Sequence, residues 1–230
     1  MLDYPGRVSA VLFLPGCNLR CPWCQNRELV LTPGAVPQGI PLEAALGFIA
    51  GRRKVLGGVA VSGGEPTLYP QLGDIIGRIH GLGLPVKLDT NGMNPPALKA
   101  LEGYARPDHI ALDLKLAPER YGELLPPGRG PGKDPAKDPA GALAESAALI
   151  RSSGIPHEYR SLALPGAYFG PPDVAALSPL VDGGPWYFRP FAPGNCLEPA
   201  WDRFEAPADA ESLAAEARKQ GKNGIAAGKR

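Results

Sequence analysis

The chain has 230 residues, and its 24 Lys and Arg against 23 Asp and Glu leave a formal net charge of +1. The length suffices for one hydrophobic core, 44% of the residues are hydrophobic, and the balanced charge argues against nucleic acid or an acidic membrane surface as the main partner. No run of about 18 apolar residues and no signal-peptide pattern occurs, so we expect a globular, cytoplasmic protein without a membrane span.

Short apolar runs alternate along the chain with amphipathic segments. The spacing of apolar residues predicts helices over Leu42–Arg53, Leu72–His80 and Ala140–Ser153. The apolar runs, most of which contain β-branched or aromatic residues, predict six strands. These strands are Val8–Leu14, Gly58–Ser62, Pro85–Asp89, His109–Leu114, His157–Leu164 and Trp186–Phe191.

This alternation predicts an α/β fold with a parallel sheet that is covered by helices on its outer face. Six β/α units are two short of the eight that close a full barrel, so we expect a partial, TIM-like (β/α)6 barrel. A further helix around Ala208–Gln220 is expected as a C-terminal appendage. The expected division is a core of residues 1–205 and a C-terminal helix and tail of residues 206–230.

Three cysteines lie close together after the first strand, in the pattern CxxxCxxC at Cys17, Cys21 and Cys24. Three thiolates on one loop can bind three irons of a [4Fe-4S] cluster, which usually takes four cysteines, and so leave one iron open to a small molecule. The alternatives are a zinc site or buried structural thiols. No second CxxC or His-x-His group is present to close a zinc site.

The cysteine loop resembles the cluster loop of the radical S-adenosylmethionine (SAM) enzymes, in which SAM fills the open position. After the second strand, Gly63-Gly64-Glu65-Pro66 matches the motif that holds the methionine amino group of SAM in that superfamily. Glycines allow backbone groups to approach a ligand closely. The alternative for this segment alone is an ordinary turn.

Two further strand ends resemble the SAM-binding strands of the glycyl-radical-enzyme activases. They are Asp89-Thr90-Asn91-Gly92 and Asp113-Leu114-Lys115. Residues 2–7, 158–160, 164–166 and 191–196 are most similar to the activating proteins of anaerobic ribonucleoside-triphosphate reductases. The chain departs from this family at Gln25, where histidine is common, and has no cysteines for a second cluster.

The resemblance implies a SAM site built from the cluster loop and the ends of the later strands. Lys115 is expected to pair with the SAM carboxylate, and its alternative is a solvated lysine. Arg160 is expected to reach the SAM carboxylate or ribose, and Trp23 to shield the cluster or pack on adenine. The full set of SAM-binding candidates is Trp23, Gln25, Gly63, Gly64, Glu65, Pro66, Asp89, Thr90, Asn91, Asp113, Lys115, Arg160 and Arg189.

A monovalent cation is a further expectation at the ends of the third and fourth strands. Asp89 and Asp113 close adjacent strands, SAM brings a third carboxylate, and Lys115 supplies one positive charge against these three. Oxygen ligands from Asp89, Thr90 and Asp113 would suit a hard cation. The alternative is that Asp89 caps the turn that follows it.

The resemblance implies an enzyme that cleaves SAM reductively to a 5′-deoxyadenosyl radical, with electrons from a flavodoxin- or ferredoxin-type donor. This radical would remove a hydrogen atom from a glycine of a partner glycyl radical enzyme, and the resemblance indicates an anaerobic ribonucleotide reductase as that partner. The alternatives are a small-molecule radical SAM enzyme of the carboxy-deazaguanine synthase type, or a non-enzymatic iron–sulfur carrier or sensor.

Two features remain open in the sequence. Cys196 follows the sixth strand. We expect an inert buried thiol, and the alternatives are a fourth cluster ligand or a thiol at the substrate site. The segment 116–139 contains a Pro- and Gly-rich stretch on the catalytic face, and we expect it to dock the partner's glycine-bearing segment. His80, His109 and His157 lie in no nucleophile pattern and are expected to be structural.

Overall fold

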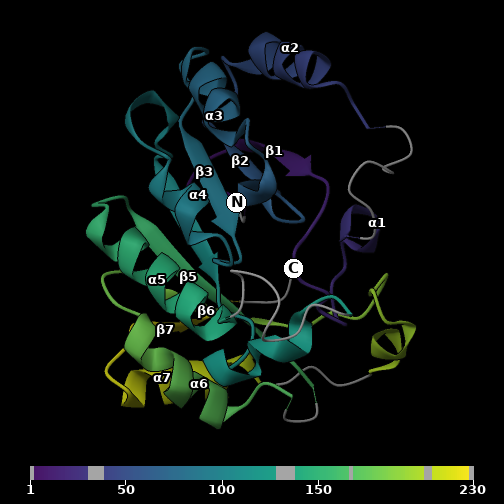
Figure 1. Ribbon diagram of the computed structural model, residues 1–230, viewed down its shortest axis with the longest axis vertical. Coiled ribbons are helices and arrows are strands. Elements are labelled where there is room, and N and C mark those ends of the chain that lie inside the picture. The colour runs from purple at the N-terminus through teal and green to yellow at the C-terminus, as the bar shows by residue number, and fades with distance from the viewer. Residues whose placement is uncertain (1–2, 31–38, 128–137, 166–167, 205–208, 228–230) are drawn as a thin grey trace.

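Seven parallel strands form one curved sheet in the computed structural model, which describes residues 3–30, 39–127, 138–165, 168–204 and 209–227 (Figure 1). The strands lie side by side in chain order, and every neighbouring pair is parallel. The six predicted strands are confirmed, each end within one residue. The observed strands are β1 Ser9–Leu14, β2 Gly58–Gly63, β3 Val86–Thr90, β4 His109–Asp113, β5 His157–Ala163, β6 Trp186–Pro190 and β7 Gly224–Ala226.

Helices connect these strands and stand side by side along the outer side of the sheet (Figure 1). In α3, for example, Leu72, Ile75, Ile76 and Ile79 form one buried stripe, as their helical spacing predicts. Three of the predicted helices are confirmed as α2, α3 and α5. The helices are α1 Arg27–Val30, α2 Leu42–Arg52, α3 Leu72–His80, α4 Pro95–Lys99, α5 Pro139–Ser152, α6 Pro171–Leu177 and α7 Ala210–Lys219.

The helices α4 and α6 were not predicted because each is short and begins with two prolines. Proline disrupts a helix interior but is well suited to its first turn, where its missing N–H has no partner to lose. Short 3-10 helices complete the connections. They are η1 Pro66–Leu68, η2 Gly103–Ala105, η3 Pro118–Leu124, η4 Ser178–Leu180 and η5 Pro199–Arg203.

The two faces of the sheet differ in chemistry. Val86 and Leu88 of β3 are fully buried in the apolar layer under the helices, whereas Lys87 and Asp89 point to the opposite, inner face. The same alternation places apolar residues of β4 and β5 outward and charged ones inward. The inner face of the partial barrel is therefore polar, and it is where a charged ligand can be accommodated.

The expected C-terminal helix is present as α7 and packs on the core. Leu213, Ala214 and Ala217 of α7 are buried, and the helix packs on α6 and β6. It leads into β7, an unpredicted strand that pairs with β6. The expected boundary between residues 205 and 206 lies outside the described residues.

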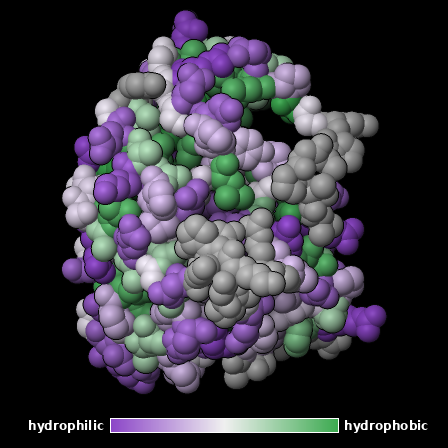
Figure 2. Space-filling model, in the orientation of Figure 1, coloured by the Kyte–Doolittle hydropathy of each residue, from purple (hydrophilic) through white to green (hydrophobic). Residues whose placement is uncertain are grey.

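Within the described residues, no helix is both long and apolar enough to cross a lipid bilayer. On the face drawn in Figure 2, hydrophobic residues appear as separate patches between hydrophilic ones.

Candidate functional site

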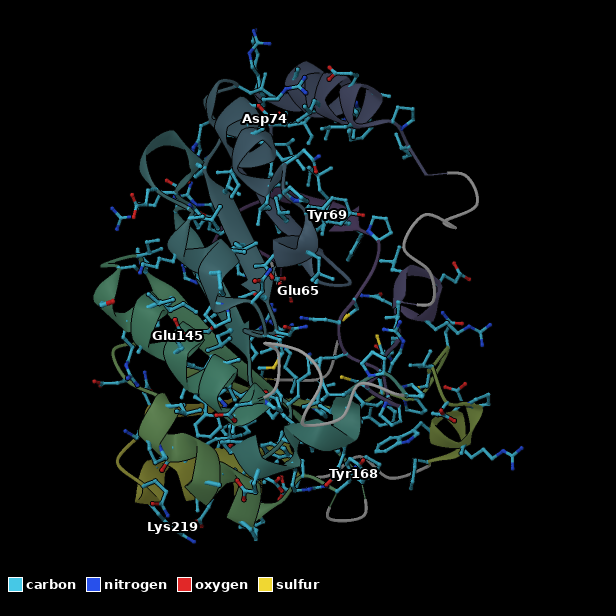
Figure 3. The ribbon with its side chains drawn as sticks, in the orientation of Figure 1. Glu65, Tyr69, Asp74, Glu145, Tyr168 and Lys219 are labelled. Carbon is cyan, nitrogen blue, oxygen red and sulfur yellow. The ribbon has the colours of Figure 1, made fainter. Side chains whose placement is uncertain are left out.

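The loop that follows β1 carries the three cysteines and is held by hydrogen bonds to its own backbone and to neighbouring segments. The Gly16 N–H donates to the Leu29 carbonyl at 2.6 Å. The guanidinium of Arg20 donates to the carbonyls of Cys17 and Leu19 at 2.8 and 2.9 Å. Arg20 thus ties the loop in a turn that presents its cysteines together. In the view of Figure 3, yellow sulfur atoms lie between the labelled Glu65 and Tyr168.

The sulfur of Cys17 lies beside hydrogen-bond donors that can stabilise a bound thiolate. The Sγ of Cys17 accepts from the Leu19 N–H at 3.4 Å and from the Asn91 side-chain amide at 3.8 Å, and such hydrogen bonds tune iron–sulfur sites. Without a bound metal, burial raises the pKa of the Cys17 thiol, and it raises the pKa of Cys21 to about 12. The described residues contain no group of three or more His, Cys, Asp and Glu arranged to bind a single metal ion. Cluster binding by Cys17, Cys21 and Cys24 therefore stays a prediction.

The segment after β6 clamps the cysteine loop from the other side. The Gln25 side-chain amide donates to the Ala192 carbonyl at 2.5 Å, and the Asn195 side-chain amide donates to the Gln25 carbonyl at 3.3 Å. The Leu197 N–H donates to the Cys24 carbonyl at 2.9 Å. Gln25 thus has a structural contact that the sequence did not indicate.

Cys196 lies within this clamping segment and is fully buried. Burial and a hydrogen bond to Asp202 raise the pKa of its thiol to about 11. The hydrogen bond to Asp202 distinguishes Cys196 from the three loop cysteines, and its inert role stays a prediction.

The two glycines after β2 are required by a close approach of backbones. The Gly63 φ of +128° lies in a region that favours glycine, and a Cβ there would lie 2.3 Å from the Leu14 carbonyl oxygen. A Cβ on Gly64 would lie 2.0 Å from the Gly16 carbonyl oxygen. In this structure, the glycines therefore allow the end of β2 to contact the end of β1 and the cysteine loop. Their predicted contact with SAM is untested.

Glu65 is buried, 1% exposed, and both oxygens of its carboxylate accept hydrogen bonds within the protein. Its Oε1 accepts from the Thr67 hydroxyl at 2.6 Å and the Thr90 hydroxyl at 2.8 Å, and its Oε2 accepts from the Asn91 N–H at 2.7 Å. Burial raises the pKa of Glu65 in spite of these bonds. Glu65 therefore joins the ends of β2 and β3, and Pro66, also buried, begins η1 beside it.

The turn after β3 is capped by Thr90 and Asn91. The Thr90 hydroxyl accepts from the Gly92 N–H at 3.1 Å, and the Asn91 side-chain oxygen accepts from the Met93 N–H at 2.9 Å. The alternative role of Asp89 as the cap is therefore wrong. Asp89 instead points to the inner face, where it meets two cationic side chains.

Arg160 of β5 binds both Asp89 and Asp113, so the carboxylates of these two adjacent strands lie close together, as predicted. Its Nε donates to Asp113 Oδ1 at 2.8 Å, and its Nη1 donates to Asp89 Oδ2 at 3.2 Å. The Nζ of Lys115 lies 3.4 Å from Asp113 Oδ2. Burial opposes ionisation of Asp113, but Arg160 and Lys115 lower its pKa to about 2. For Lys115, burial lowers the pKa, but Asp113 together with Cys21, Tyr121 and Cys24 outweighs it, so the pKa is raised.

Lys87 of β3 extends this group of charges toward the floor of the barrel. It is fully buried, its ammonium is bonded to Asp89 Oδ1, and its Nζ lies 3.7 Å from Glu158 Oε1. The Nε2 of His109 lies 3.5 Å from Glu158 Oε2. The expectation that Lys115 alone faces the carboxylates of Asp89, Asp113 and SAM is wrong, because Lys87 and Arg160 supply two more positive charges.

Other predicted residues lie around this centre. Trp23 is buried against Tyr168 and Trp201, with ring centroids 5.5 and 5.3 Å away, so it packs in an aromatic cluster beside the cysteine loop. Arg189 lies on β6 in register with Leu162 of β5. Of the expected docking segment, residues 128–137 lie outside the described residues, and the preceding part forms η3.

The family model of the radical SAM superfamily matches residues 11–167, more than half of the chain. The chain belongs to the radical SAM superfamily. The match includes the cysteine loop, the two glycines and the charged strand ends described above, and it confirms the resemblance seen in the sequence.

Two kinds of relative are similar in sequence. A protein of Methanocaldococcus jannaschii, provisionally named a glycyl-radical enzyme activating enzyme, is 35% identical over 125 residues, 54% of this chain and 50% of that protein. A 7-carboxy-7-deazaguanine synthase of Hyperthermus butylicus is 37% identical over 93 residues, 40% of this chain and 38% of that protein. The chain thus spans half or less of the length of these relatives.

Solved structures confirm the fold. A radical SAM methyltransferase from Sphaerobacter thermophilus superposes with a TM-score of 0.70 at 16% identity, covering 97% of this chain and 67% of that one. Streptococcus suis SuiB bound to S-adenosylmethionine gives 0.64 at 12% identity, covering 96% and 50%. At these identities the likeness concerns the fold alone.

Proposed function

We propose that this protein cleaves SAM reductively and that the resulting radical removes a hydrogen atom from a glycine Cα of a partner protein. The partner is a glycyl radical enzyme of the anaerobic ribonucleotide reductase type, and a flavodoxin- or ferredoxin-type protein supplies the electron. When bound to Cys17, Cys21 and Cys24, a [4Fe-4S] cluster supplies that electron to the sulfonium of SAM, whose S–C5′ bond breaks to give methionine and the 5′-deoxyadenosyl radical.

The contact between Asn91 and Cys17 carries this proposal. It joins the turn after β3 to the cysteine loop after β1, and Glu65 joins the same turn to the end of β2. Three strand ends with superfamily motifs therefore meet at one place, at the carboxyl edge of a parallel sheet, where such folds bind their ligands.

The roles of the protein groups follow from their positions. Lys115 is 22% exposed, more than Lys87 or Arg160, so it is placed to pair with the SAM carboxylate. Arg160 is bonded to two aspartates and orients them, and any contact with SAM would use its remaining N–H groups. Trp23, in its aromatic cluster, shields the cysteine loop from water.

The glycine substrate is supported by the relative from Methanocaldococcus jannaschii, which covers about half of the chain. The 7-carboxy-7-deazaguanine synthases support a second candidate, a small-molecule radical SAM enzyme, through shorter matches. We leave the predicted monovalent cation out of the proposal, because the aspartate oxygens that would bind it are already paired.

The test is anaerobic reconstitution with iron and sulfide, followed by mass spectrometry of 5′-deoxyadenosine. The reaction is run with dithionite and SAM, alone, with a candidate glycyl radical enzyme, and with a candidate small-molecule precursor of 7-carboxy-7-deazaguanine. We expect the partner protein to acquire a glycyl radical, seen as a doublet by electron paramagnetic resonance. The absence of 5′-deoxyadenosine in all three reactions would refute SAM cleavage, and a deazaguanine product would refute the protein substrate.

A further inference from the structure

Three cationic and three anionic side chains form one continuous group on the inner face of β3, β4 and β5. From the floor to the mouth of the barrel, successive members lie within ion-pair distance of one another. The order is Glu158, Lys87, Asp89, Arg160, Asp113 and Lys115.

Every oxygen that was predicted to bind a cation is engaged by a protein donor. Asp89 uses Oδ1 for Lys87 and Oδ2 for Arg160, and Asp113 uses Oδ1 for Arg160 and Oδ2 for Lys115. The hydroxyl of Thr90 donates to Glu65 and accepts from the Gly92 N–H. A cation at these oxygens would have to share them with an ammonium or guanidinium group, whose like charge opposes its binding.

Lys87 is the least usual member of the group. A fully buried lysine is rare, because removing an ammonium from water is costly unless a carboxylate compensates for it. Here Asp89 and Glu158 compensate from two sides, and His109 is the other titratable group that faces Glu158. Lys87 lies two residues before Asp89 on β3, so the strand itself fixes it on the same face.

We propose that Lys87 is a built-in counter-ion that takes the place of a bound monovalent cation at the SAM site. Together with Arg160 it pairs Asp89 and Asp113 from within the barrel, and Lys115 at the mouth can be shared between Asp113 and the carboxylate that SAM brings. SAM binding by this protein is then independent of the identity of the monovalent salt. The inference rests on the proposed function, since it concerns the same SAM site.

The test measures SAM affinity by anaerobic equilibrium dialysis of the reconstituted protein at fixed ionic strength in sodium, potassium or tetramethylammonium chloride. For the unchanged protein, we expect dissociation constants that agree within about twofold across the three salts, because the site's charges are paired internally. A Lys87→Met variant keeps the length of the side chain and removes the charge. We expect it to bind SAM about tenfold more weakly in tetramethylammonium than in sodium or potassium, because a small cation can then fill the vacated place.

Two further variants separate charge from folding. Lys87→Met combined with Asp89→Asn removes one charge of each sign, so we expect salt independence to return. Lys219→Met removes an exposed lysine of α7, whose side chain is 73% exposed, and should behave as the unchanged protein in every salt. A second readout is the 23Na linewidth, which we expect to show saturable sodium binding to Lys87→Met and none to the unchanged protein.

The inference is overturned if the unchanged protein binds SAM several-fold more tightly in sodium or potassium than in tetramethylammonium. Should Lys87→Met fail to fold, this comparison on the unchanged protein still decides the matter. Failure of the proposed function is distinguishable, since it appears as no SAM binding or no 5′-deoxyadenosine in any salt.

Discussion

The backbone N–H of Asn91 donates a hydrogen bond of 2.7 Å to the buried carboxylate of Glu65. This bond joins the end of β3 to the end of β2, and the side chain of Asn91 continues to Cys17. A glutamate that belongs to a recognised ligand motif therefore also has a role inside the protein, as the junction of three strand ends.

Replacing Glu65 by glutamine should destabilise the protein. A glutamine places an N–H₂ group where a carboxylate oxygen now accepts a hydrogen bond, so one buried donor loses its acceptor, at a cost of about 1–3 kcal/mol. The free energy of unfolding, measured by urea denaturation of the cluster-free reduced protein, checks this. Glu145→Gln on the exposed face of α5 is the matched control, with an expected change within about 0.5 kcal/mol. An equal effect of both variants would contradict the junction role.

Replacing Gly64 by alanine should disrupt the cysteine loop. The added Cβ would lie 2.0 Å from the Gly16 carbonyl oxygen, which cannot be accommodated without moving the backbone. We expect a loss of stability of about 2 kcal/mol or more and poor iron incorporation, measured by denaturation and by iron and sulfide content. Gly47→Ala on α2 meets no atom within 4 Å and should raise stability by about 0.5–1 kcal/mol through helix propensity. A well-tolerated Gly64→Ala would show that the close approach is not required.

Replacing any one of Cys17, Cys21 and Cys24 by alanine should abolish the absorption of the [4Fe-4S] cluster and SAM cleavage. Cys196→Ala should retain both, because the CxxxCxxC loop supplies three ligands and the Cys196 thiol is instead hydrogen-bonded to Asp202. Iron content, visible absorption and 5′-deoxyadenosine yield are measured for all four variants after anaerobic reconstitution. If Cys196→Ala loses the cluster as fully as the others, the cluster has four protein ligands and no open iron.

The outer face of the sheet was predictable because one physical cause determines it. Strands such as Val86–Thr90 carry apolar residues that must be buried under helices, and this requirement fixes their limits to within one residue. β7 was missed because Gly224–Ala226 has too few residues to give a pattern. It is a strand because it pairs with β6, and Gly224 lies close against α7, where a Cβ would be 2.5 Å from the Ala214 carbonyl oxygen.

The candidate site was predicted in part. The motifs identified Glu65, Asp89 and Asp113, but motif matching cannot show which protein groups already occupy their oxygens. Lys87 was missed because a lysine is rarely buried, so one in a strand is usually assigned to the solvent-exposed face. Its alternation with the apolar Val86 and Leu88, next to Asp89, was the available signal for an inner-face ion pair.

The pair of Asp113 and Arg160 should give the protein a measurable acid sensitivity. Arg160 and Lys115, against the opposing effect of burial, lower the pKa of Asp113 from 3.8 to about 2 in the folded protein. A carboxyl whose folded pKa is lowered stabilises the fold above its unfolded pKa, and this contribution is lost as the pH falls through the folded pKa. The stabilisation should therefore be present above pH 3.8 and disappear as the pH falls to about 2.

The difference in unfolding free energy between the unchanged protein and Asp113→Asn checks this directly. At neutral pH the variant removes the carboxylate that pairs with Lys115 and one of the two that pair with Arg160, so it should be less stable than the unchanged protein. As the pH falls from 3.8 to about 2, the protonated Asp113 comes to resemble asparagine, and the difference should shrink toward zero. Asp74→Asn on the exposed face of α3 should change stability by no more than about 0.5 kcal/mol at any of these pH values. A difference for Asp113→Asn that stays constant down to pH 2 would mean that Asp113 is not ionised against Arg160 in the folded protein.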